Sequence, residues 1–182
     1  MSGVEIYLAS IPDYLSIALS NPQQKVRFGR GCRGSWILRL WGPSSVLVGD
    51  STTSNGVECF LNDGGRLVIG NDCMFASHIS LHVGDNHAIF DIDSGQILNY
   101  SERPFIEIGA HVWVATRGIV LADTVIGDGC VVGAGSVVKG IFPPCALIAG
   151  APAEVIKQGV SWTRDYWGHG AKEVVEKLRA GA

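Results

Sequence analysis

The chain has 182 residues, of which 24 are glycine and only 17% are charged, and its net charge at pH 7 is −3. A slightly acidic chain without a basic face is not expected to bind nucleic acid. No stretch approaches the roughly 20 apolar residues that cross a bilayer, so membrane insertion is not expected. Residues 1–5 lack the basic and apolar regions of a secretory signal, which predicts a cytoplasmic protein.

The N-terminal segment, residues 1–25, is predicted to contain a short helix over residues 11–19. Pro12 would occupy the first turn of this helix, where a proline is tolerated, and Asn21-Pro22 would end it. The main domain is expected to follow, over residues 26–157.

A six-residue period dominates the main domain. One run extends from Val57 to His87, and a second, in a different phase, places a branched apolar residue at Ile108, Val114, Val120, Ile126, Val132 and Val138. This period fits neither a helix nor a flat strand and is that of a parallel β-helix. Three hexads make one coil, and coils stack about 4.8 Å apart with the repeated apolar residues inside. The sequence therefore predicts an all-β solenoid.

The cysteines support a reducing environment. There are five, an odd number, and none forms a CxxC pair, which argues against a disulfide framework. Cys73 and Cys130 each lie four residues after a repeated isoleucine. We expect both to be small buried thiols rather than metal ligands.

Residues 88–107 interrupt the repeat, directly after His87 and shortly before Trp113. Long irregular loops in compact domains are often functional, so we predict a protruding loop that covers an active site. A tolerated surface insertion is the alternative. In the C-terminal tail, residues 158–182, a short amphipathic helix is predicted over residues 171–180, capping or packing beside the solenoid.

Four motifs carry a family resemblance: Gly84-Asp85-Asn86-His87, the segment IGAHVW at 108–113, the turn GAPA at 150–153, and Trp162. With these motifs the chain resembles the hexapeptide-repeat acyltransferases, which have a left-handed β-helix. It is most similar to bacterial sugar and capsular polysaccharide O-acetyltransferases. The resemblance implies acetyl-CoA as cosubstrate, a carbohydrate acceptor, no required metal, and a homotrimer with active sites between subunits. Outward-facing Trp113 and Trp162 would add apolar surface for that trimer.

His87 is the candidate general base, because histidine titrates nearest neutral pH and a sugar hydroxyl needs a base. It is expected to face inward at the end of the first run. Asp85 or a backbone carbonyl could hold the other ring nitrogen. A solvated loop histidine is the alternative. Trp113 matches an active-site tryptophan of the family; it could line the thioester channel, stack on a sugar, or simply pack between subunits.

Coenzyme A would lie against small residues on the outside of the coil, because backbone amides there can bond to its pantetheine arm. The small candidates are Ala115, Gly133, Ala134, Gly135 and Ala149, with Lys139 and Lys157 as partners for its phosphates. Turn geometry also explains the glycines. The family usually has Gly, Asn and Lys where this chain has Ala115, Ala151 and Glu154.

For the acceptor sugar, the loop offers Asn99, Tyr100 and Arg103, which could equally be solvated. Transfer to the amine of an amino sugar would use the same base and remains an alternative. A second alternative is a zinc-binding γ-carbonic-anhydrase-like β-helix, since His82 and His87 have matching spacing. That site needs a third histidine from an earlier coil, and the chain has none before His78.

Overall fold

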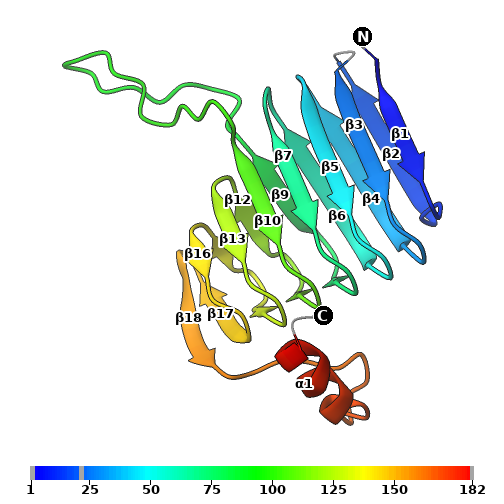
Figure 1. Ribbon diagram of the computed structural model, residues 1–182. Coiled ribbons are helices and arrows are strands. Elements are labelled where there is room, and N and C mark those ends of the chain that lie inside the picture. The colour runs from blue at the N-terminus through cyan, green and yellow to red at the C-terminus, as the bar shows by residue number, and fades with distance from the viewer. Residues whose placement is uncertain (1–2, 21–22, 181–182) are drawn as a thin grey trace.

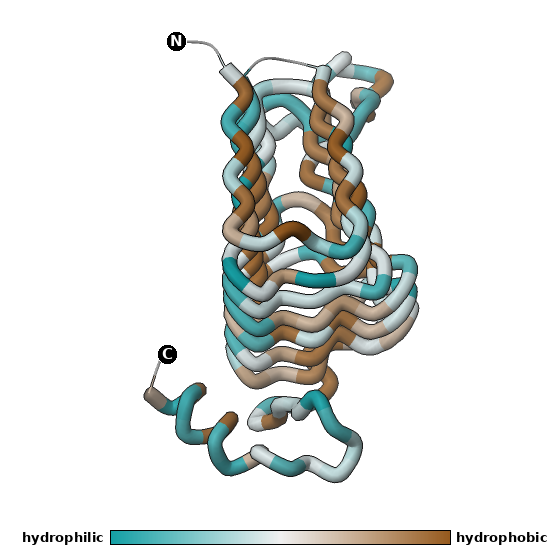
Figure 2. Tube along the Cα trace, turned by 90° about the vertical axis from the view of Figure 1, so that its right-hand side faces the viewer, coloured by the Kyte–Doolittle hydropathy of each residue, from teal (hydrophilic) through white to brown (hydrophobic). Residues whose placement is uncertain are grey.

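The computed structural model describes residues 3–20 and 23–180, which form a parallel β-helix with one protruding loop and one C-terminal helix (Figure 1). One seven-stranded sheet takes a strand from each successive turn, and every neighbouring pair in it is parallel. Its strands, in spatial order, are β1 (Glu5–Leu8), β3 (Gln24–Phe28), β5 (Ser44–Val48), β7 (Arg66–Ile69), β10 (Phe105–Ile108), β13 (Thr124–Ile126) and β16 (Ile141–Phe142). The turns lie stacked on one another in Figure 2.

The second sheet has eleven strands and closes the other sides of the coil. Each of the first turns of the coil contributes one long strand to this sheet: β2 (Tyr14–Leu19), β4 (Arg33–Leu40) and β6 (Thr53–Leu61). Strand β6 pairs with both β8 (Met74–Phe75) and β9 (Ile79–Val83) of the next turn. The coil therefore changes from two strands a turn to three. The remaining strands are β11 (Trp113–Val114), β12 (Ile119–Leu121), β14 (Val131–Val132), β15 (Val137–Val138), β17 (Ala146–Gly150) and β18 (Ala153–Gln158).

The predicted helix over residues 11–19 is wrong. Residues Tyr14–Leu19 form β2, which pairs in parallel with β4 along its whole length. Leu15 and Ile17 lie beside the buried Trp36 and Leu38 of the next turn. The alternation of apolar and polar residues in this segment thus allows it to extend the apolar interior, which outweighs the local signal from proline. The solenoid accordingly starts at β1 and not at residue 26.

The repeated apolar positions form the core as predicted. All six residues of the second run are at most 2% exposed. In the first run Val57, Ile69 and Leu81 are buried, but Asp63 and His87 are exposed. Both exceptions lie at the same edge of the coil, at the turns that follow β6 and β9. The expectation that His87 faces inward is therefore wrong, because the chain leaves the coil before reaching it.

The interior thiols behave as expected. Cys73 and Cys130 are buried and free, and each Sγ donates a hydrogen bond to a backbone carbonyl at 3.1 Å. Burial raises the pKa of the Cys73 thiol to about 12. Such thiols fill space and are inert toward thiolate chemistry.

The C-terminal part of the chain closes the last coil and then packs beside the solenoid. Strand β18 turns back antiparallel to β17 and so covers the edge of the last coil. The predicted C-terminal helix is confirmed as α1 (Ala171–Ala180), which packs beside the turn at Gly129 through Leu178.

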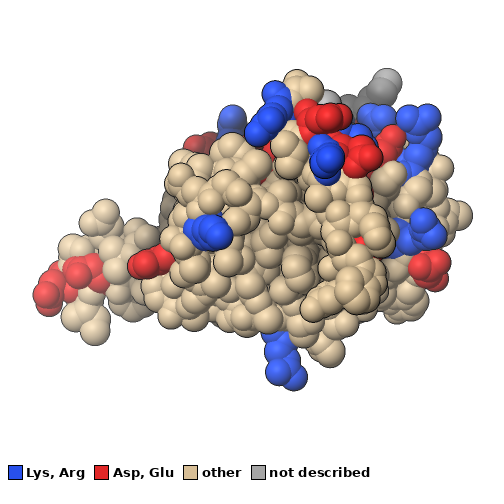
Figure 3. Space-filling view, turned by 90° about the horizontal axis from the view of Figure 1, so that it is seen from below, with Lys and Arg blue, Asp and Glu red and all other residues tan. Residues whose placement is uncertain are grey.

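No helix among the described residues is long and apolar enough to cross a membrane. In the face of Figure 3, basic and acidic side chains lie together along an edge, with no continuous basic surface.

Candidate active site

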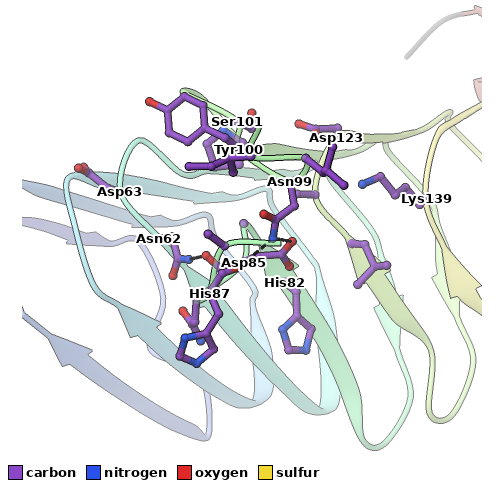
Figure 4. Close-up of a pocket in the computed structure, with 18 residues that line it drawn as sticks. Asn62, Asp63, His82, Asp85, His87, Asn99, Tyr100, Ser101, Asp123 and Lys139 are labelled. Carbon is purple, nitrogen blue, oxygen red and sulfur yellow. Dashed lines mark hydrogen bonds between the residues drawn. The ribbon is translucent and has the colours of Figure 1, made fainter. Parts of the chain in front are cut away.

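A pocket of about 440 Å³ lies at one edge of the prism, beneath the base of the protruding loop. The structure places the loop at residues 84–104, between β9 and β10, rather than at 88–107. The turns that follow β6, β12 and β15 complete the pocket wall. The lining residues labelled in Figure 4 are Asn62, Asp63, His82, Asp85, His87, Asn99, Tyr100, Ser101, Asp123 and Lys139.

The chain leaves the coil at Gly84, which has a φ of +98°. A Cβ there would lie 3.2 Å from the Cβ of Asn62 and 3.3 Å from the ring of Pro104. Glycine is therefore required by both its backbone conformation and its close neighbours. This sharp exit sets the start of the loop and with it the position of His87.

His87 lies exposed at the rim of the pocket, and no described residue forms a hydrogen bond with its ring. In Figure 4 the rings of His87 and His82 point to the same side, away from Tyr100. His82 is stacked on Phe60, with centroids 4.7 Å apart and planes at 11°. Burial lowers the pKa of His82 below its ordinary value, against the opposing charges of Asp85 and Glu58. His87 therefore offers an accessible ring nitrogen, while His82 is a packed side chain whose burial disfavours the charged form.

Asn99 holds the base of the loop together. Its Nδ2 donates to Asp85 Oδ2 at 2.8 Å and to the His87 carbonyl at 2.9 Å, and its Oδ1 accepts from the Ile89 amide at 2.7 Å. Asn62 Nδ2 also donates to the Asp85 carbonyl. The Asp85 carboxylate is thus engaged by Asn99 and not by the His87 ring, contrary to one of the expected arrangements. Asn62 and Asn99 therefore fix the backbone around His87, and not its ring.

Beyond its base the loop is a small hairpin with an apolar surface. Phe90 and Ile97 form an antiparallel bridge, and Asp91 Oδ1 accepts hydrogen bonds from the amides of Asp93 and Ser94 at the tip. Large exposed apolar side chains cover the hairpin: Ile89, Phe90, Ile92, Ile97, Leu98 and, at its base, Tyr100. Exposure on this scale indicates a surface that meets another molecule.

Two predicted acceptor contacts lie at the pocket and one does not. Tyr100 lines the pocket and is exposed, and Asn99 lines it with all its polar atoms already bonded within the loop. Arg103 lies instead in a shallow depression beside Arg66 and Glu107, which form an ion pair. Arg103 is therefore separate from the group around His87.

Trp113 lies at a different part of the prism from His87. It is half-buried on β11, with its ring 6.3 Å from that of Trp162. Trp162 is only 6% exposed, stacks on His111 at 4.4 Å, and donates its indole N–H to the His111 carbonyl at 2.8 Å. The expectation of an outward Trp162 is therefore wrong, because the C-terminal tail folds back and buries it on the same chain.

The tail is fixed in place by an ion-pair network. His111 Nδ1 lies 2.8 Å from Asp72 Oδ2, and its Nε2 lies 3.0 Å from the Trp162 carbonyl. Arg164 donates to Asp72 Oδ1 from both Nε and Nη2. Burial alone would raise the pKa of Asp72, but the hydrogen bonds from His111 and Arg164 outweigh it and hold the pKa below its ordinary value. His111 is thus a structural residue.

The small residues predicted to receive coenzyme A stack at a third location, the edge between the β8–β11–β14 and β9–β12–β15 faces. Their turns are joined by hydrogen bonds, such as Gly135 N to the Thr116 carbonyl and Gly133 N to the Ile148 carbonyl. A Cβ added at Gly135 would meet nothing within 4 Å. The members of this edge are Ala115, Gly133, Ala134, Gly135 and Ala149. Lys139 lines the pocket of His87, whereas Lys157 lies exposed on β18.

Five of the lining residues labelled in Figure 4 were not predicted for the acetyltransferase site: Asn62, Asp63, His82, Ser101 and Asp123. A usable signal was present for Asp63, because it is a polar residue at a position of the first run where the repeat predicts an apolar one. No three His, Cys, Asp or Glu side chains in the described parts of the chain lie close enough to hold a metal ion.

The chain is similar to known acetyltransferases in sequence and in fold. It is 35% identical over 121 residues to a polysialic acid O-acetyltransferase from Escherichia coli O1:K1 / APEC, a match that covers 66% of this chain and 39% of the relative. The polySia-specific acetyltransferase NeuO has a TM-score of 0.70 at 23% identity, covering 99% of this chain and 91% of that one. The polysialic acid O-acetyltransferase OatWY has a TM-score of 0.62 at 22% identity, covering 88% and 92%.

The chain spans less than two thirds of the length of the curated relatives it matches. No family model matches the chain. The fold is the left-handed β-helix of these acetyltransferases, and the resemblance to hexapeptide-repeat acyltransferases predicted from the motifs is confirmed.

Proposed function

We propose that this chain is an acetyl-CoA-dependent O-acetyltransferase that acts on a sugar hydroxyl of a polysaccharide or its precursor, in the cytoplasm, with His87 as the general base. The observation that carries the proposal is the placement of His87. Its ring is exposed at the rim of a pocket lined by both polar and apolar side chains, beneath a loop that leaves the coil directly beside it. The sequence similarity to a polysialic acid O-acetyltransferase supports a sugar acceptor.

The chemistry asked of His87 is removal of one proton. A sugar hydroxyl is a very weak acid, and a neutral imidazole accepts its proton as the oxygen forms the new bond to the acetyl carbon. Polar groups on the pocket wall, among them Asn62, Asp63 and Asp123, can bond to neighbouring hydroxyls of the same sugar. Asp85 and Asn99 position the backbone of His87 rather than its ring.

In this proposal coenzyme A binds along the small-residue edge. Bound there, acetyl-CoA supplies a thioester whose acetyl group passes to the sugar oxygen while the thiol leaves. Gly135 has a φ of +70° and open space where a Cβ would be, so an extended arm can lie close to the backbone. Peptide groups at turns of the coil can then bond to its amides. Lys157, exposed on β18, is a cation available to its phosphates, whereas Lys139 lines the pocket of His87 and not this edge.

A second copy of the chain completes the site in this proposal. His87 and the small-residue edge lie on opposite sides of the face formed by β9, β12 and β15. One subunit therefore does not bring its own base to its own coenzyme edge. The apolar hairpin extends away from the coil (Figure 1) and is suited to cover a neighbour. We propose a homotrimer in which the hairpin and His87 of one subunit meet the small-residue edge and Trp113 of the next.

The test is acetyl-CoA turnover against a panel of sugars and glycans, with free thiol as the readout and mass spectrometry of the product. In His87→Ala we expect kcat to fall about 10²- to 10⁴-fold, the usual contribution of a general base. His169→Ala is the matched control, because His169 is exposed in the tail and pairs only with Asp165. Full activity in His87→Ala would refute the assignment.

The nature of the bond formed separates the two transfer reactions. An O-acetyl ester is released by mild alkali, whereas an N-acetyl amide survives the same treatment. We therefore expect mild alkali to release the acetyl group from the product. A product that resists this treatment would show that the acceptor is an amino sugar.

A further inference from the structure

Three aromatic rings form a continuous stack on the outside of the solenoid. Trp41 lies at the end of β4, Phe60 on β6 and His82 on β9, so each ring comes from a successive turn. The Trp41 and Phe60 centroids are 6.0 Å apart with planes at 15°, and the Phe60 and His82 centroids are 4.7 Å apart with planes at 11°. Parallel coil spacing thus builds a ladder of rings that runs along the prism.

The ladder starts at the candidate active site. His82 lines the pocket, as does Asn62, which follows Phe60 by two residues. The His82 and His87 rings point to the same side in Figure 4. The stack therefore extends from the face on which His87 presents its ring, along the solenoid toward its N-terminal turns.

Trp41 is the open end of this ladder. Phe60 has a ring packed on each side, whereas Trp41 has Phe60 as its one ring partner among the described residues. Trp41 is 46% exposed, which is a large apolar surface to leave in water. Arg39 lies next to it, with its guanidinium 6.0 Å from the Phe60 ring and its Nε donating to Glu58 at 2.7 Å.

We propose that Trp41 is a binding subsite for a second sugar unit of the acceptor, so that the protein acts on a linked glycan in preference to a free monosaccharide. This inference rests on the proposed function. One face of a pyranose ring presents C–H bonds and packs on the electron-rich face of an indole. The neighbouring Arg39 and Glu58 supply the hydrogen-bonding groups that orient sugar hydroxyls around such a contact. The two ring steps from His82 to Trp41 leave room for linked units between the pocket and the subsite.

The experiment compares acceptor length in the full-length protein. Initial rates are measured for wild type, Trp41→Ala, Trp41→Phe and Trp167→Ala with sialic acid, its α2,8-linked dimer and its tetramer, and with a matching ladder of neutral glucose oligomers. Trp167 is the control, because it is 79% exposed in the tail and its ring stacks with no ring of the described residues other than that of Tyr166. For the longer acceptor, kcat/KM of Trp41→Ala is expected to fall about 2- to 12-fold, the value of one aromatic contact. The monosaccharide rate and the Trp167→Ala rates stay at wild-type level, and Trp41→Phe keeps most of the length preference.

Equal loss on short and long acceptors, or no loss on either, overturns the subsite while the acetyltransferase assignment stands. If the wild type acetylates none of these sugars, saturation-transfer NMR with the tetramer still separates the two questions. A signal that Trp41→Ala abolishes supports the subsite without the enzyme, and an unchanged signal overturns it. Light scattering gives the final check: a lower assembly mass for Trp41→Ala than for wild type shows that a neighbouring copy covers the ring and overturns the proposal.

Discussion

Replacing Asn99 by alanine should loosen the base of the loop without unfolding the solenoid. The substitution removes three hydrogen bonds, two donated to Asp85 and the His87 carbonyl and one accepted from the Ile89 amide. At a net value of about 0.5–1.5 kcal/mol each, and toward the low end because the site is exposed, the loss is about 2 kcal/mol. That free energy corresponds to a roughly 30-fold larger opening constant for the loop base.

Hydrogen–deuterium exchange measures this directly. The amides of Ile89 and Leu98 should exchange about 30-fold faster in Asn99→Ala, since Leu98 N donates to the Ile89 carbonyl across the hairpin. Asn99→Asp keeps the acceptor for Ile89 but places a second carboxylate beside Asp85, so it should be at least as disruptive at pH 7. Asn86→Ala is the control, because no described residue bonds to its side chain. Unchanged exchange at Ile89 in Asn99→Ala would refute the reasoning.

Three further predictions concern the scaffold. Ile126→Ala should lower the free energy of unfolding by about 2–5 kcal/mol, because the Ile126 side chain is only 1% exposed. Ile141→Ala on the same sheet should change it by less than about 0.5 kcal/mol, because Ile141 is 81% exposed. Urea denaturation of the two variants measures the difference. Cys73, with a pKa of about 12, should stay unmodified by iodoacetamide at pH 8 in the native protein and react after unfolding, as intact mass would show. The advantage of wild type over Asp72→Asn in unfolding free energy should be fully present above pH 3.8, the ordinary pKa of the carboxyl, and should be lost as the pH falls through the depressed folded pKa. An advantage that does not decline with falling pH in acid denaturation experiments would contradict this.

The core of the solenoid could be predicted from the sequence because its physics is local and repeated. Every sixth residue from Ile108 to Val138 points into the interior of the coil, so the same type of apolar residue recurs at the same interval. The segment Tyr14–Leu19 was predicted wrongly since its structure depends on pairing with β4 in the next turn. Pro12 before this segment and Asn21-Pro22 after it fit a helix as well as a strand until that partner is known. The predicted helix end at residues 21–22 lies outside the described residues.

The site could be predicted only in outline. His87 was chosen as a candidate because it ends the first six-residue run and matches a motif of the family, and Asp63 lies at the same edge of the coil one turn earlier. The roles of Asp85 and Asn99 could not be read from the chain, because the two meet across fourteen residues of irregular loop. The ladder from Trp41 to His82 was missed for a related reason: its members come from three turns whose register is set by strand pairing, and no short spacing in the sequence records that they stack.

A solenoid can acquire a specific site at little cost to its fold. The backbone bonds on both sides of the long loop stay intact: Asn62 N donates to the Val83 carbonyl before it and Arg66 N to the Pro104 carbonyl after it. The coil therefore continues whatever the length of the loop between β9 and β10, because the entropic cost of closing a longer loop rises only slowly. Under the proposed function, the edge that carries His87 can thus vary in acceptor specificity while the small-residue edge, built from short turns that pack on one another, keeps a constant shape. Exchange of residues 84–104 with the corresponding loop of a relative should accordingly change the preferred acceptor and leave the unfolding transition close to that of the parent chain.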